Sequence, residues 1–136
     1  MEDKIQTWMN FNKIHDTLNQ RLEKHLKSRY NLTISEFAVI TVLNEDKDEG
    51  FTIHYLSNTV NLSHSAVSRL VARLETCHTV ERGSHDTDKR STVVKLTDQG
   101  RRDYQETLPE ITAIISQVFN EEKDQMSGFL SRLLDR

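Results

Sequence analysis

Residues 82–100, RGSHDTDKRSTVVKLTDQG, are the first candidates for chemistry because they concentrate charge. Two acids, two bases and a histidine fall within a few positions, and an alternating segment and a glycine follow. Most charged runs of this kind are solvated hairpin tips. Across a tight tip, however, the Asp88 carboxylate can hold the stem of Arg90 and present its guanidinium in one orientation. The rest of the chain has to decide between these two interpretations.

Catalytic and metal-binding patterns are weak in this chain. Cys77 lies next to His78, but adjacent helical residues point about 100° apart, so the imidazole does not reach the sulfur. The six histidines, at positions 15, 25, 54, 64, 78 and 85, show no short ligand spacing. We find no glycine-rich phosphate loop. The sequence therefore predicts no enzyme, no cofactor and no metal, and it predicts Cys77 to be a small buried hydrophobe.

Composition and charge set the broad class. The 136 residues carry a net charge of −3, but the segment 51–100 holds six Lys or Arg against five acids. No apolar run approaches the roughly 18 residues of a membrane helix, and the N-terminus does not resemble a signal peptide. We expect a cytoplasmic protein with no membrane partner.

The segment FTIHYLSNTVNLSHSAVSRLVARLE predicts two helices joined by a tight turn. Thr52 caps a short helix to about Val60, Asn61 takes a left-handed turn conformation, and Ser63 caps the second helix. The inner face of that helix is apolar, whereas its outer face is small and polar first and cationic farther on. Such a face suits a helix that enters a DNA major groove about 12 Å wide. The alternative is an ordinary helical hairpin with a solvated face. The outward set is His64, Ser65, Ser68, Arg69, Ala72 and Arg73.

The flanking segments complete a pattern of helices with one β arm. TVER and STVVKL predict two short strands on either side of the charged loop, which makes the loop a wing. Apolar periodicity predicts helices over about 3–29, 34–45 and 121–135, with TISE as a capping box. A further helix begins after Thr97, and Pro109 should bend it. Strand, charged loop and strand directly after a candidate recognition helix rarely occur together by accident.

The chain resembles the MarR family of bacterial winged-helix transcriptional regulators over essentially its whole length. The motifs that carry the resemblance are LSHSAVSRLVARLE, the Asp88-Lys89-Arg90 of the wing and LTDQG. The resemblance implies a mainly α fold with a small β wing and a single winged-helix domain, 1–136. Its DNA-binding lobe would span 34–98, and its dimerisation helices 1–30 and 100–136. It also implies a homodimer on a pseudo-palindromic operator. Relatives respond to a small aromatic acid, to cysteine oxidation or to metal. The sequence departs from the family pattern at two places. His78-Thr79 stand where the recognition helix usually ends in Gly-Leu, and Gly83 stands where a second basic residue often follows Arg82.

The functional expectation is a sequence-specific regulator of double-stranded DNA, most simply a repressor, that a small aromatic effector releases. In that frame Arg90 would enter a minor groove, where negative potential is concentrated. The rival is a dimeric protein-interaction module whose charged wing contacts protein. The predicted DNA-binding residues are Ser63, His64, Ser65, Ser68, Arg69, Arg73, Asp88, Lys89 and Arg90.

The terminal helices carry apolar stripes that a small winged lobe cannot bury. Contiguous apolar patches beyond a few hundred Å² usually mark an interface. An intramolecular three-helix packing is the alternative. We favour a homodimer, because two-fold symmetry also places two recognition helices about one DNA turn apart.

Overall fold

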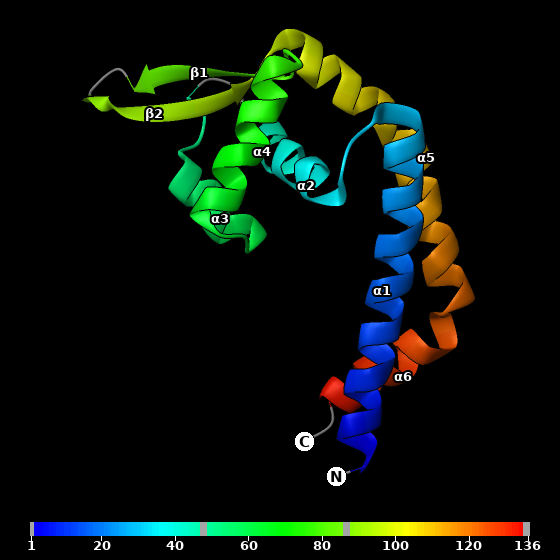
Figure 1. Ribbon diagram of the computed structural model, residues 1–136. Helices are drawn as coiled ribbons and strands as arrows, with labels where there is room; N and C mark the ends of the chain where they lie inside the picture. Colours follow the sequence, from blue (N-terminus) through cyan, green and yellow to red (C-terminus); the bar gives the residue numbers. More distant parts are fainter. Residues whose placement is uncertain (1, 47–48, 86–87, 135–136) are drawn as a thin grey trace. The chain divides into compact units, whose positions relative to one another are not determined.

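Helices and one two-stranded sheet make up the chain in the computed structural model, which describes residues 2–46, 49–85 and 88–134 (Figure 1). The mainly α fold with a small β wing is confirmed. The chain divides into two units. Leu32–Thr107 is called the winged lobe here, and Met1–Asn31 with Leu108–Arg136 is called the terminal-helix unit. The elements in order are α1 Glu2–Tyr30, α2 Ile34–Asn44, α3 Ile53–Val60, α4 His64–Thr76, β1 Val80–His85, β2 Asp88–Leu96, α5 Asp98–Glu121 and α6 Lys123–Leu134.

The three helices that open the winged lobe begin at the capping residues that the sequence predicted. Thr33 and Glu36 form a reciprocal capping box at the start of α2. Thr52 caps α3 and Ser63 caps α4, each by accepting a backbone N–H three residues on at 3.1 Å. Each cap satisfies a donor that the first helical turn leaves unpaired. The short helices therefore start at defined residues.

The core of the winged lobe lies between α2, α3, α4 and the wing. Its largest fully buried side chains are aliphatic, because interior packing at crystal-like density favours side chains without polar atoms. The inner face of α4 is close to the prediction, although Leu70 is only partly buried. Fully buried members from these elements are Val39, Leu43, Leu56, Val67, Val71, Leu74, Val80 and Val94.

The wing is an antiparallel pair in which Val80 faces Leu96 and Arg82 faces Val94. The register shifts between Ser84 and His85. Both strands are longer than the sequence suggested. Phe51 adds an isolated antiparallel bridge to Val94, with backbone hydrogen bonds of 3.0 and 2.8 Å. The wing is thereby anchored to the segment that leads into α3.

The junction between the wing and α5 is closely packed around one carbonyl group. The Thr79 carbonyl accepts the backbone N–H of Thr97 at 3.0 Å. The Thr97 hydroxyl lies 2.7 Å from the His78 carbonyl oxygen, to which it donates, and 3.2 Å from that of Thr79. The Thr97 hydroxyl in turn accepts from the N–H of Gly100 at 2.9 Å, which is the predicted cap of α5. Gly100 is buried, and a Cβ at this position would lie 2.1 Å from the Thr79 oxygen. Only glycine fits here without movement of backbone.

An arginine joins the other end of α2 to α5 within the winged lobe. Nη1 of Arg101 donates to the carbonyl and side-chain oxygens of Asn44 at 3.1 and 2.9 Å. Its Nη2 donates to the Asp46 carbonyl at 3.0 Å. The last carbonyls of a helix lack intrahelical partners and carry partial negative charge, so a guanidinium is well suited to this place.

The terminal-helix unit holds α1, the second part of α5 and α6. Arg21 donates to Glu121 at 2.9 Å, and this hydrogen bond lowers the pKa of the Glu121 carboxyl. Arg29 donates to Glu110 at 3.3 Å. Pro109 lies inside α5. None of the described helices is long and apolar enough to cross a membrane. Large exposed apolar residues gather in this unit, namely Ile5, Trp8, Met9, Phe11, Phe119, Leu130 and Leu134.

The packing around Gly100 gives a stability prediction. Gly100→Ala should lower the free energy of unfolding by about 2 kcal/mol, because the new methyl group meets backbone that cannot move cheaply. Thermal or urea unfolding followed by circular dichroism measures the change. Gly83→Ala is the matched control, since nothing lies within 4 Å of a Cβ there. Equal stability of the two variants would show that the junction is looser than described.

Candidate nucleic-acid interface

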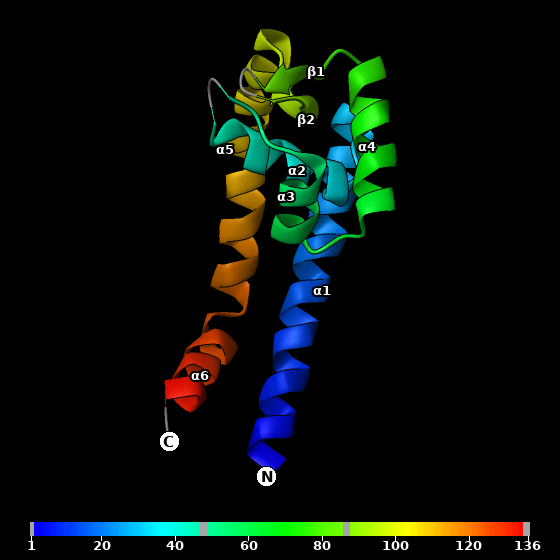
Figure 2. The same ribbon diagram turned by 90° about the vertical axis from the view of Figure 1, so that its left-hand side faces the viewer.

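The outward face of α4 is the largest group of predicted site residues that the structure brings together. α4 forms one edge of the winged lobe in the view of Figure 2. His64, Ser65 and Arg69 are exposed, and Ser68 is partly exposed. Ser63 is exposed as well, but its hydroxyl accepts the Ala66 N–H as the helix cap. The first two turns therefore present small polar side chains, and a cation follows.

Arg73 also lies on α4, but its guanidinium has an intramolecular partner that the sequence analysis missed. Nη1 of Arg73 donates to both carboxylate oxygens of Glu36, at the start of α2. The Glu36 side chain is only 3% exposed, whereas that of Arg73 is 42% exposed. The sequence assigned Glu36 only to the capping box. The burial of Glu36, which the structure shows, accounts for the pair, because a buried carboxylate requires a cation or several donors.

The predicted wing-tip residues fall at the start of β2. The backbone of Asp88, Lys89 and Arg90 belongs to the strand, and His85 pairs with Asp88. Their side chains lie outside the described part of the chain, so the proposed contact between Asp88 and Arg90 stays a prediction. At the wing base, Arg82 donates to Glu75 of α4 at 3.3 Å. The strands extend from the C-terminal end of α4 as an arm (Figure 1).

The C-terminal end of α4 is closed by a left-handed residue that is not glycine. The N–H of Thr79 donates to the Leu74 carbonyl at 2.9 Å, and that of His78 donates to the Glu75 carbonyl at 3.0 Å. These two bonds define a Schellman motif, in which His78 takes the position that glycine prefers, with φ 62°. The helix ends cleanly. The substitution of His for Gly therefore does not disrupt the helix end.

Cys77 corrects one sequence expectation. It was predicted to be a small buried hydrophobe, but the structure leaves it exposed at the C-cap of α4. The reason is positional, because the inner stripe of the helix ends at Leu74, so a residue three positions on lies at the helix end, beyond the core. Among the described residues, no three His, Cys, Asp or Glu side chains gather as a metal site.

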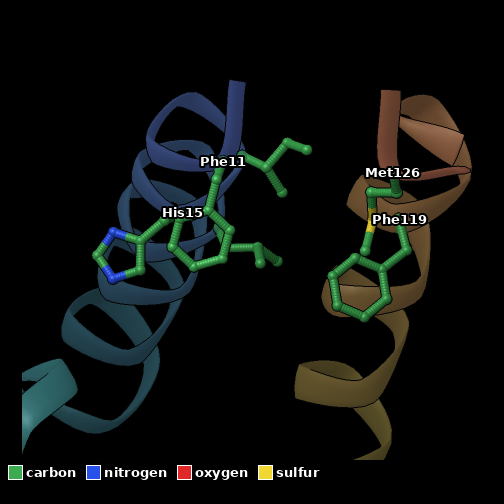
Figure 3. A pocket seen from close by; sticks show the side chains of 6 residues that line it. Phe11, His15, Phe119 and Met126 are labelled. Atoms are coloured by element: carbon green, nitrogen blue, oxygen red, sulfur yellow. The ribbon is translucent and has the colours of Figure 1, made fainter. Parts of the chain in front are cut away.

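A separate apolar pocket lies in the terminal-helix unit. Its volume is about 200 Å³. Phe11 and His15 of α1 lie on one side, and Phe119 of α5 and Met126 of α6 lie on the other (Figure 3). Ile14 and Leu18 complete the lining. The lining is almost wholly apolar, so the pocket suits an apolar occupant.

Comparisons with known proteins agree with this geometry. Residues 30–91 match a protein-family model that is described as "MarR family". The repressor YetL of Bacillus subtilis is 26% identical over 127 residues, which are 90% of this chain and 75% of YetL. A MarR-family regulator of Streptomyces coelicolor, solved in complex with DNA, has a TM-score of 0.81 at 21% identity, over 98% of this chain and 86% of its own. The regulator BldR of Sulfolobus solfataricus has a TM-score of 0.78 at 22% identity, over 96% of both chains.

The left-handed His78 gives a second prediction. His78→Gly should stabilise the protein by about 0.5–1 kcal/mol, because glycine removes the steric cost of positive φ. The greater conformational entropy of glycine in the unfolded chain offsets part of this stabilisation. Thermal unfolding measures the shift. Asn61→Gly, at φ 58°, is the control and should gain less, since Asn tolerates this conformation. A loss of stability in His78→Gly would mean that the imidazole makes an interaction worth more than the strain.

Proposed function

We propose that the chain is a winged-helix transcriptional regulator of the MarR family, which binds double-stranded DNA sequence-specifically as a homodimer and represses transcription. The observation that carries this proposal is the outward face of α4, with Ser65, Ser68 and Arg69 on an exposed helix edge. Small hydroxyls let the helix approach base edges closely. A following arginine suits phosphate or guanine.

The wing supplies the second contact of the proposed complex. An arm that extends from the end of α4 can follow the DNA backbone into the neighbouring groove. Arg90 is the side chain proposed to enter that groove, with Asp88 as the residue that orients it and Lys89 as a phosphate contact. The base of this arm is held by the Arg82–Glu75 pair and by the Phe51 bridge. A fixed base favours a defined wing position.

The homodimer is proposed from the apolar surface of the terminal-helix unit. Trp8 is 60% exposed, Met9 51% and Leu130 53%. Exposed apolar side chains of this size on one small unit are costly in water and usually mark an interface. The apolar pocket between α1 and the helices α5 and α6 belongs to the same surface. A second copy of the chain would cover both.

Two-fold symmetry connects the dimer to the operator. Two recognition helices related by a dyad read half-sites about 34 Å, or one turn, apart, so the operator should be pseudo-palindromic. Release by a small aromatic acid stays a prediction from the family resemblance. The rival function, a dimeric protein-interaction module, predicts no salt-dependent binding to any duplex.

Binding to DNA at several salt concentrations tests the proposal. Wild-type protein should select a pseudo-palindromic duplex and lose affinity steeply as salt rises, because phosphate contacts release counterions. Arg69→Gln should weaken binding to all duplexes and reduce the log–log salt slope by about 0.9 for each phosphate that the variant no longer binds. Ser65→Ala should change the preferred bases with little effect on random DNA. Fluorescence anisotropy on selected and random duplexes measures all three.

The neutral control is Gln105→Ala, an exposed position on α5 of the same lobe. It should leave affinity and salt slope unchanged. Equal losses on every duplex for Ser65→Ala would contradict its role as a base reader. Absence of salt-dependent binding by wild-type protein would favour the interaction module.

A separate prediction tests the dimer. Trp8→Asp combined with Leu130→Asp should give monomers, because carboxylates are expensive to bury in an apolar seam. Both side chains are exposed in the isolated chain, so its fold should survive. Tyr55→Asp is the matched control, an aromatic of the winged lobe that is 46% exposed. Sedimentation velocity should show a dimer for the control. A folded dimer of the double variant would place the interface elsewhere.

A further inference from the structure

The most deeply buried carboxylate of the described chain lies directly behind the candidate recognition helix. Glu36 is 3% exposed at the start of α2. One of its oxygens accepts the Thr33 N–H at 2.8 Å, and both accept from Nη1 of Arg73. A buried charge is tolerated only where it is paired and hydrogen-bonded. Glu36 therefore needs Arg73, which is 37 residues away in sequence.

The position of Arg73 on α4 gives this pair a geometric role. Arg73 follows Arg69 by four residues and Ser65 by eight, so each lies about one turn from the next along the same helix. The Glu36 carboxylate is fixed by its capping box to the first turn of α2. The ion pair consequently ties the C-terminal half of α4 to the start of α2. A helix held in this way has a restricted rotation about its own axis.

A phosphate contact by the paired nitrogen of Arg73 would break this arrangement. If Nη1 turned towards DNA, the Glu36 carboxylate would stay buried without its cation, which is among the most destabilising changes in a protein interior. Arg69 has no such constraint from Glu36 and is exposed. The two arginines of α4 are thus expected to have different roles, although the sequence places both on the outward face.

We propose that Arg73 is a positioning residue whose Nη1 stays paired with Glu36 when DNA is bound. By pairing with Glu36 it sets the rotation of α4, and so determines where Ser65 and Ser68 meet the base edges. This inference rests on the proposed DNA-binding function and assigns a specificity role to Glu36, a residue too deeply buried to touch DNA. Loss of the pair should reduce discrimination between sequences more than it reduces binding to phosphates.

Four variants separate a positioning residue from a phosphate contact. Arg73→Gln removes the cation and leaves Glu36 unpaired. Glu36→Gln keeps an acceptor for the Thr33 N–H and removes the charge. The double variant Glu36→Gln with Arg73→Gln replaces the ion pair by two neutral amides. Arg69→Gln is the matched control, the same substitution one turn earlier on the same helix. Thermal unfolding verifies the folding of each variant, and affinities for selected and random duplexes are measured across a salt series.

Arg73→Gln should lower the preference for the selected over the random duplex by about tenfold, in line with the coupling between residues in contact. Its salt slope should match that of the wild type. Adding Glu36→Gln should restore most of the preference and of the melting temperature, because it removes the unpaired buried charge. Glu36→Gln alone should lower the preference by less than Arg73→Gln does. Arg69→Gln should instead flatten the salt slope.

Three outcomes overturn the inference. A reduced salt slope in Arg73→Gln, equal to that of Arg69→Gln, would make Arg73 a phosphate contact. Failure of Glu36→Gln to restore Arg73→Gln would show that the two residues do not act as a unit. If Arg73→Gln does not fold, an unchanged preference in folded Glu36→Gln would decide against the proposal. If the wild-type protein selects no duplex, the proposed function itself is contradicted. This result is distinct from the three outcomes that contradict only the role of Arg73.

Discussion

Burial of the Glu36 carboxylate is the constraint on which the arrangement of the winged lobe depends. A charge inside a small apolar core is stable only if its partners are already in place when water leaves. The Thr33 N–H and the Arg73 guanidinium are those partners, and they come from the start of α2 and from α4. At the far end of α2, Arg101 binds the carbonyl of its last residue, Asn44, and that of Asp46 just beyond it. α2 is therefore held by cations from later in the chain at both ends.

Local signals made most of the fold predictable. The caps at Thr33, Thr52, Ser63 and Thr97 each bind a backbone N–H three residues away, so every partner is visible within one short stretch of sequence. The left-handed turn at Asn61 was predicted for the same reason, and φ is 58° there. Apolar periodicity located the helices to within a few residues, because one face of each must be buried.

Partners distant in sequence could not be predicted. The interaction of Glu36 with Arg73 and that of Arg101 with Asn44 span 37 and 57 residues, and no local pattern encodes either. The site prediction was affected accordingly. The residues on the exposed face of α4 were predicted together from the sequence, but the direction of the Arg73 guanidinium was not. Of the six cations counted in the segment 51–100, Arg73 and Arg82 each have an acidic partner inside the lobe, which a count of charges does not reveal.

The exposed thiol at the end of α4 makes the protein convenient to label. Cys77 is the one cysteine among the 136 residues, and it lies immediately after the last residue of the candidate recognition helix. A maleimide dye or spin probe would therefore attach at a single position without prior mutagenesis. A symmetric pair of chains would carry two such probes, one beside each helix. Their separation could be followed directly by energy transfer or by electron–electron resonance.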